Sequence, residues 1–136
     1  MANSFLTQVI EEGPQNAIIK LTGVLDTSNL ARTRAVQVSA LNQSNTGYTP
    51  TKVRIDHMDY SVADQLELLL DWDATTPVAI LPIAGRGRMS FWNFGGLQNN
   101  AGSGVTGDIY ITTFGWASGT QVFSVVLELV KQGPAL

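Results

Sequence analysis

The sequence predicts an all-β protein: an antiparallel β-sandwich of about eight strands with a jelly-roll-like arrangement. Three observations carry this prediction. Apolar residues alternate along most segments with a period of two rather than 3.6. Glycine, proline and asparagine separate these segments. The length of 136 residues suits one domain. Residues 1–136 are therefore assigned to a single sandwich, with an N-terminal arm at 1–8 and a long loop at 26–50 that holds one short strand.

The first two long strands are expected in "IIKLTGVL", where Ile19, Leu21 and Leu25 share one face, and in "TKVRIDHMDYSV". In the second segment the apolar alternation changes phase between His57 and Met58. One inserted residue reverses the facing of every residue after it. We therefore expect a β-bulge near His57, with His57 on the same face as the apolar residues before it.

The segment "SVADQLELLLDWD" fits either a helix or a strand. Ser61 could cap a helix, with Asp64 three residues further on. As a strand, the segment places four apolar residues on one face and three acidic residues on the other: Leu66, Leu68, Leu70 and Trp72 against Glu67, Asp71 and Asp73. We favour the strand because the segments around it have period two.

The second half of the chain predicts four more strands. "TPVAILPIAG" contains Pro82, which cannot donate to a ladder, so this strand should lie at an edge or carry a bulge. A turn at Gly85 is expected to join it to "RGRMSFW" in a hairpin. "GDIYITTFGW" and "TQVFSVVLELVKQ" are the clearest strands. The last one is apolar on both faces, so we expect both faces to be covered, by a loop or by a second copy.

The composition bears on the kind of partner. Charged residues make up 14% of the chain and the net charge is −3, whereas a typical soluble domain has about a quarter charged residues. A surface this poor in charge favours coverage by identical copies or by a larger partner, and its acidity disfavours nucleic-acid binding. The chain has no cysteine. We identify no secretory signal and no membrane-spanning segment.

The glycine-rich stretch at 94–108, "FGGLQNNAGSGVTGD", does not fit a phosphate-binding loop. Such a loop needs Lys and Ser or Thr after its last glycine, with a helix behind. Here Val, Thr and Gly stand at 105–107, and a strand follows. We expect no cofactor there. Residues 94–97 are interpreted as an anchor packed on the sandwich, and residues 98–104 as an uncharged surface for contact with a neighbouring subunit.

No group of residues predicts a reaction. His57 is the only histidine, and no serine elbow or cysteine nucleophile accompanies it. We expect it to be a hydrogen-bonded structural histidine. Asp71 and Asp73 share a strand face, as calcium ligands or glycosidase carboxylates can. Few other oxygen ligands lie nearby in the sequence, so we interpret the pair as a solvated strand end. We predict no catalytic residue and no metal ligand.

The segment "GRGRMSFWNF" combines arginine with aromatic residues. Such residues are enriched at protein interfaces. They also suit stacking on single-stranded nucleic acid, or a core of aromatics with exposed arginines. In an acidic chain we favour a protein interface. The candidate interface residues, including those of the glycine-rich stretch and a later turn, are Arg86, Arg88, Trp92, Phe94, Leu97, Gln98, Asn99, Asn100 and Trp116.

Several segments resemble small virion proteins of tailed bacteriophages. The resemblance rests on "LDWDATTPVAIL", "GRGRMSFWNFGGLQNNAGSGVTGDIYITTFGWASG" and "FSVVLELVKQ", together with "IIKLTGVLDTSNL" near the start; residues 31–50 do not share it. The chain is similar to the jelly-roll cement, or decoration, proteins of phage heads. The resemblance implies binding to the outside of the capsid, bridging of major capsid protein subunits as a dimer or trimer, and assembly in the bacterial cytoplasm. It transfers no functional residues position by position.

The sequence therefore leads to the hypothesis of a capsid cement protein without enzymatic activity. Its expected partners are the major capsid protein and further copies of the chain, and neither nucleic acid nor a membrane. One alternative is a carbohydrate-binding jelly-roll module, in which Trp92, Trp116, Asn99 and Asn100 form a stacking platform. Another is a component of the virion tail or neck.

Overall fold

The computed structural model describes residues 3–13, 15–41 and 50–132. These residues form nine strands and two short 3₁₀ helices. The strands are β1 Ser4–Glu12, β2 Asn16–Leu25, β3 Thr33–Val36, β4 Lys52–Val62, β5 Glu67–Trp72, β6 Val78–Ile83, β7 Arg86–Ser90, β8 Ile109–Phe114 and β9 Gln121–Gln132. The helices are η1 Val38–Ala40 and η2 Trp92–Phe94.

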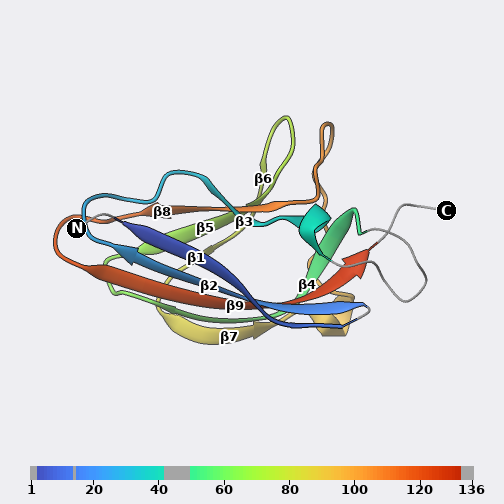
Figure 1. Ribbon diagram of the computed structural model, residues 1–136, viewed down its shortest axis with the longest axis horizontal. Coiled ribbons are helices and arrows are strands. Elements are labelled where there is room, and N and C mark those ends of the chain that lie inside the picture. Colours follow the sequence, from blue (N-terminus) through green and yellow to red (C-terminus); the bar gives the residue numbers. More distant parts are fainter. Residues whose placement is uncertain (1–2, 14, 42–49, 133–136) are drawn as a thin grey trace.

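The strands form two antiparallel sheets that pack face to face (Figure 1). One sheet has the order β1-β2-β9-β4-β7 and the other the order β3-β8-β5-β6. Strands β2 to β9 divide equally between the sheets, and most connections cross from one sheet to the other. This connectivity is that of a jelly roll. The predicted all-β, jelly-roll-like sandwich is confirmed.

The structure has one strand more than predicted, which is β1. The predicted N-terminal arm at 1–8 is therefore wrong for its described part. From Ser4 onward this segment is part of the five-stranded sheet, where it pairs with β2. Met1 and Ala2 lie outside the described residues. The long loop at 26–50 holds the expected short strand, which is β3, followed by η1. Residues 42–49 of that loop also lie outside the described residues.

The core lies between the sheets and is built from alternating positions of each strand. In β2 the buried residues are Ile19, Leu21 and Leu25, as the alternation predicts. In β5 the buried apolar residues include Leu68 and Leu70, which confirms the strand over the helix for this segment. Each side chain buried in this way contributes about 1.5–3 kcal/mol relative to an exposed one.

The predicted bulge in β4 is present, one residue earlier than expected. The pairing of β4 with β9 shifts between Ile55 and His57, so Asp56 is the extra residue. Ile55 and Met58 are both fully buried. His57 consequently lies on the outer face, opposite Glu128, and not on the core face with the residues before it.

The strand that contains Pro82, β6, lies at the edge of the four-stranded sheet, as predicted. Its pairing with β5 is irregular between Leu70 and Asp71. The expected β6–β7 hairpin is wrong, although Gly85 does form a turn with φ 73°. Strand β6 pairs with β5 in one sheet and β7 pairs with β4 in the other. The chain therefore changes sheets at Gly85.

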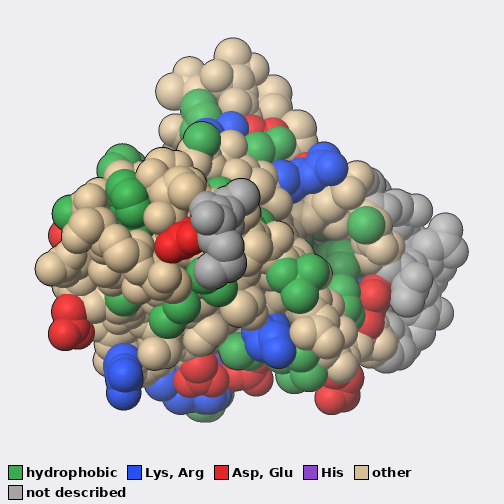
Figure 2. All heavy atoms as spheres, turned by 60° about the vertical axis from the view of Figure 1, so that its left-hand side comes forward, with side chains coloured by type: hydrophobic (Ala, Val, Ile, Leu, Met, Phe, Trp, Pro, Cys, Tyr) green, Lys and Arg blue, Asp and Glu red, His purple; other side chains and the backbone are tan. Residues whose placement is uncertain are grey.

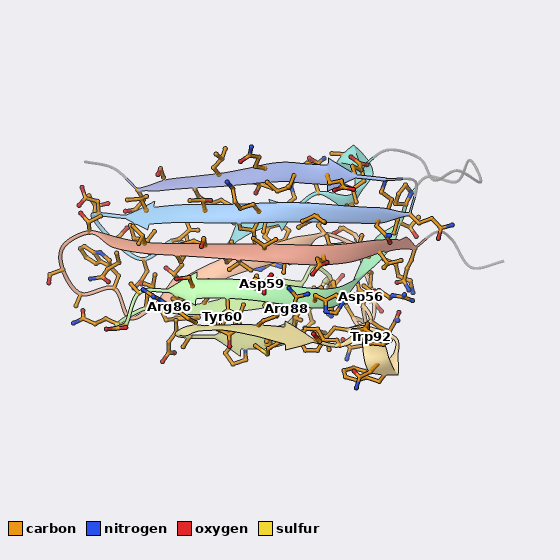
Figure 3. All side chains as sticks on the ribbon, turned by 90° about the horizontal axis from the view of Figure 1, so that it is seen from below. Asp56, Asp59, Tyr60, Arg86, Arg88 and Trp92 are labelled. Carbon is orange, nitrogen blue, oxygen red and sulfur yellow. The ribbon has the colours of Figure 1, made fainter. Side chains whose placement is uncertain are left out.

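Strand β9 lies in the middle of the five-stranded sheet, and its inner face is buried as predicted. No loop of the described chain covers its outer face, and coverage by a second copy stays a prediction. Figure 3 looks onto this outer face, and no other described segment is drawn over the five strands. Val122 is 53% exposed there. Within the described residues, the outer face of β9 is open.

Candidate interaction surfaces

Among the described residues, the most exposed aromatic side chains stand on η2, directly after β7. The side chains of Trp92 and Phe94 are 62% and 65% exposed. We refer to residues 92–94 as the aromatic knob. Figure 3 shows Trp92 at one end of the five-stranded sheet, beyond Asp56. A position where two large aromatic side chains face solvent is unusual, because aromatic residues are otherwise the main contributors to cores and interfaces.

The base of the aromatic knob is held by the bulge in β4. The backbone N–H of Phe91 donates to the carbonyl of Asp56 at 2.7 Å. Leu97 and Ile55 exchange two backbone hydrogen bonds, of 2.8 and 3.1 Å. Gly96 has φ 82°, and a Cβ there would lie 2.6 Å from a carboxylate oxygen of Asp56. The bulge and the close approach of Gly96 thus fix where the aromatic knob stands.

The anchor predicted at 94–97 is only partly present. Leu97 is half-buried and bridged to β4, as an anchor should be. Phe94 is not part of that anchor. Its ring instead makes an edge-on contact with Phe91, at 6.2 Å between centroids. Phe94 therefore belongs to the exposed surface that the anchor supports.

Two arginines lie along β7: Arg86 at its start, at the opposite end from Trp92, and Arg88 between them (Figure 3). Arg88 donates to Asp59 at 3.0 Å and to Glu128 at 3.0 Å, across three neighbouring strands. Arg86 lies exposed on the same strand. Two carboxylates already offset the charge of Arg88, which disfavours the nucleic-acid interpretation of this segment. Such exposed ion pairs contribute about 0–1 kcal/mol each.

The rest of the glycine-rich stretch runs beside the β5–β6 turn, and the two loops rise together from the sandwich (Figure 1). The backbone N–H of Thr75 donates to Ser103 at 3.0 Å, and the hydroxyl of Thr106 donates to Asp73 at 2.8 Å. The projection at the top of Figure 2 is mostly neither hydrophobic nor charged. The expected uncharged surface is thus present, and it has a partner loop that the sequence did not indicate.

The amide side chains of this stretch differ in their roles. Gln98 donates to the carbonyl of Gly95 at 2.7 Å, and Asn99 accepts from the backbone of Ala101 at 3.1 Å. Both therefore shape the loop. Asn100 is exposed, and it is the one of the three best placed to meet a partner.

Trp116 lies in the β8–β9 connection, at the opposite end of the sandwich from the aromatic knob (Figure 1). Its indole N–H donates to the carbonyl of Gly119 at 3.0 Å, and its backbone N–H donates to Asn29 at 2.9 Å. The ring is half-buried and supports its own turn. The nine candidate residues therefore do not form one surface, and Trp92 and Trp116 do not share a stacking platform.

The paired acids Asp71 and Asp73 are not a solvated strand end. Arg32 donates to Asp71 at 2.7 Å and to Asp73 at 2.9 Å, and its guanidinium lies 4.0 Å from the ring centroid of Tyr110. Asp71 is consequently buried. The hydrogen bond from Arg32 lowers the pKa of Asp73, against the opposing effect of desolvation. This cluster holds β5 to the segment before β3, and Arg32 was not singled out from the sequence.

His57 is hydrogen-bonded, as predicted: its Nδ1 lies 2.9 Å from the hydroxyl of Ser90. A shallow hollow of about 420 Å³ lies beside it and is also lined by Glu11, Asn16 and Glu128. Among the described residues, no three histidine, aspartate or glutamate side chains gather as a metal site would require. Within the same residues, no helix is long and apolar enough to cross a membrane.

Comparison with known proteins adds no relative: no family model, no curated protein and no solved structure matches the chain.

Proposed function

We propose that this chain is a structural protein of a bacteriophage virion: a cement protein that binds the outside of the head and bridges major capsid protein subunits. The resemblance of its segments to such proteins motivates the proposal, and the jelly-roll sandwich with uncharged loops is compatible with it. The observation that carries it is the aromatic knob. Two large aromatic side chains stand in solvent on a base that is fixed by backbone hydrogen bonds.

The aromatic knob has the properties of an interface anchor. Burying Trp92 or Phe94 in a pocket of a partner would contribute about 1.5–3 kcal/mol for each side chain. The bridge between Leu97 and Ile55 already orders the backbone, so little conformational entropy is lost on binding. A modest contact of this kind, repeated over a symmetric shell, gives strong overall attachment.

The test uses capsid shells that lack the protein, to which the purified chain is added back. We expect the wild-type chain to co-sediment with the shells and to raise the temperature at which they release DNA. The double variant Trp92→Ala/Phe94→Ala should bind at least on the order of a hundredfold more weakly, since two anchors are lost. Phe114→Ala is the matched control, because Phe114 is an exposed aromatic residue on the other sheet.

If the double variant and the wild type bind the shells equally well, the aromatic knob is not the anchor. Shells that are equally stable with and without the chain would refute the cement function itself. Immunogold labelling of intact virions would assign the protein to the head or, as the alternative location, to the tail or neck. Asn100→Ala should also weaken attachment if the projecting loop meets the shell.

A further inference from the structure

We propose that β1 is a self-pairing edge: two copies of the chain join their β1 strands antiparallel about a two-fold axis at Thr7, so that their five-stranded sheets become one continuous sheet. The inference concerns the isolated chain in solution. It stands or falls independently of the virion function proposed above.

The four sheet edges of this sandwich are protected very unequally. Natural proteins protect edges with short strands, proline, charge or bulges. Strand β7 has five residues and two arginines, β3 has four residues and an irregular register, and β6 contains a proline. Strand β1 has nine residues, and its first seven, Ser4–Ile10, contain neither a charge nor a proline. This unprotected edge is therefore available for pairing.

The side chains of β1 are as exposed as its edge. Eight large apolar residues of the described chain are exposed, and three of them lie in this strand: Leu6 at 61%, Val9 at 48% and Ile10 at 51%. The pairing with β2 is regular from Ser4 to Val9 and shifts before Glu11. A regular, apolar strand with one open side fits the addition of a further strand.

A two-fold axis at Thr7 matches the faces of the two copies. Phe5, Thr7 and Val9 share the inner face of β1, since Thr7 lies opposite Leu21 of the core. Antiparallel pairing about Thr7 sets Phe5 opposite Val9 of the second copy, twice, and sets Thr7 opposite its own equivalent. An aromatic residue opposite a β-branched one is a favourable cross-strand pair. The Thr7 hydroxyl already donates to the carbonyl of Ala35 at 2.9 Å, which orients Thr7 on the inner face.

The outer face agrees with the same axis. Leu6 of one copy would have two diagonal neighbours in the second copy, Leu6 and Ile10. Such diagonal neighbours in a sheet lie roughly 7–8 Å apart. The two most exposed apolar side chains of the strand thus gain apolar neighbours. A hollow of about 330 Å³ beside Val9, at the open side of the sandwich, would be covered at its rim by Phe5 of the second copy.

Charge does not oppose a second copy in this arrangement. The acidic end of the strand, Glu11 and Glu12, lies outside the apolar stretch. About a two-fold axis at Thr7, each Glu11 faces Asn3 of the other copy. The two Glu11 residues are separated by eight strand positions, roughly 25 Å at the usual rise. This distance exceeds the Debye length of about 8 Å at physiological salt, so like charges do not oppose the pairing.

The first experiment uses the absence of cysteine from the chain. A single Thr7→Cys variant places two thiols across the proposed axis, at the roughly 5 Å between opposed Cα atoms that a disulfide accepts. Oxidation should give on the order of tenfold more linked dimer than for Val122→Cys, an exposed control position on β9. Preferential linkage through Leu6→Cys instead of Thr7→Cys would overturn the proposed register.

The second experiment measures mass in solution by light scattering over a dilution series. The wild-type chain should show the mass of two copies. Leu6→Lys should raise the dissociation constant by roughly tenfold or more, whereas Val122→Lys, on the same face of the sheet, should not. Circular dichroism would verify that both variants fold. If the wild-type chain is a monomer at all concentrations, the inference is wrong. The open edge of β1 would then suit an extended segment of another protein instead.

Discussion

Lys131 offers the sharpest test of how the sandwich is closed at one end. Its side chain is fully buried, and its ammonium group donates to Glu12 at 2.8 Å and to the carbonyl of Gly13 at 3.0 Å. These contacts tie the β1–β2 turn to the end of β9. The perturbation is Lys131→Met, which keeps the volume and removes the charge.

The magnitude follows from burial. Removing one partner of a buried ion pair typically costs 3–5 kcal/mol, because the remaining charge loses its counter-ion. Glu12 keeps 13% of its side chain in solvent, so we take the lower bound, about 3 kcal/mol. The same reasoning gives a similar cost for Glu12→Gln. The double variant carries no buried charge from this pair, so it should lie within about 1 kcal/mol of the wild type.

The assay is urea unfolding monitored by tryptophan fluorescence. With a slope of about 2 kcal/mol per molar urea, the single variants should unfold at a midpoint roughly 1.5 M lower. Arg88→Met is the matched control. Arg88 also touches two carboxylates but is 52% exposed, so the loss of both ion pairs should cost at most about 2 kcal/mol. Additive costs in the double variant would refute the reasoning, because they would mean that the two charges do not compensate one another.

Two further predictions concern the acid cluster and the glycines. The hydrogen bond from Arg32 lowers the pKa of Asp73 below its ordinary value of 3.8. The ionised Asp73 therefore stabilises the fold fully above pH 3.8, and this stabilisation is lost as the pH falls through the lowered pKa. Between about pH 5 and pH 2 the free energy of unfolding should fall less steeply in Arg32→Met than in the wild type, and equal slopes would contradict this. Gly85→Ala should cost about 1–2 kcal/mol for its left-handed backbone alone, since only open space surrounds a Cβ there. Gly107→Ala should lower the urea midpoint more than Gly85→Ala does, because the carbonyl of Thr51 occupies the place of a Cβ. Equal midpoints for the two variants would show that the backbone at Thr51 shifts at little cost.

The strands in which the sequence alternates most clearly are those that bury one face. In β2 and β5 one side meets the core and the other meets solvent or a polar cluster, so hydrophobicity alternates with the pleat. Strand β1 was not predicted, because most of its side chains are exposed and neither face is buried. Its exposed residues Leu6, Val9 and Ile10 follow no strict alternation. The same exposure that hid the strand from the sequence is what suggests a pairing role for it.

The grouping of the candidate interface residues could not be predicted, although their types could. Whether Trp92 and Trp116 meet depends on which sheet each strand joins, and the sequence does not specify the change of sheet at Gly85. The cluster of Arg32 with Asp71 joins residues from distant parts of the chain through the pairing of β3, β8 and β5. The bulge in β4 was predicted. The hydrogen bonds between Ile55, beside the bulge, and Leu97 were not, because they join residues that are distant in the sequence.

The place of β9 between β2 and β4 has a consequence for how the protein folds. The centre of the five-stranded sheet is filled by the last strand of the described chain, which pairs with one of the first. Until β9 is synthesised, β2 and β4 each have an unpaired edge facing the gap. Contacts between such distant residues form slowly, and exposed edges invite aggregation in the meantime. Refolding of this chain should therefore be slow for its size, and its yield should fall with concentration.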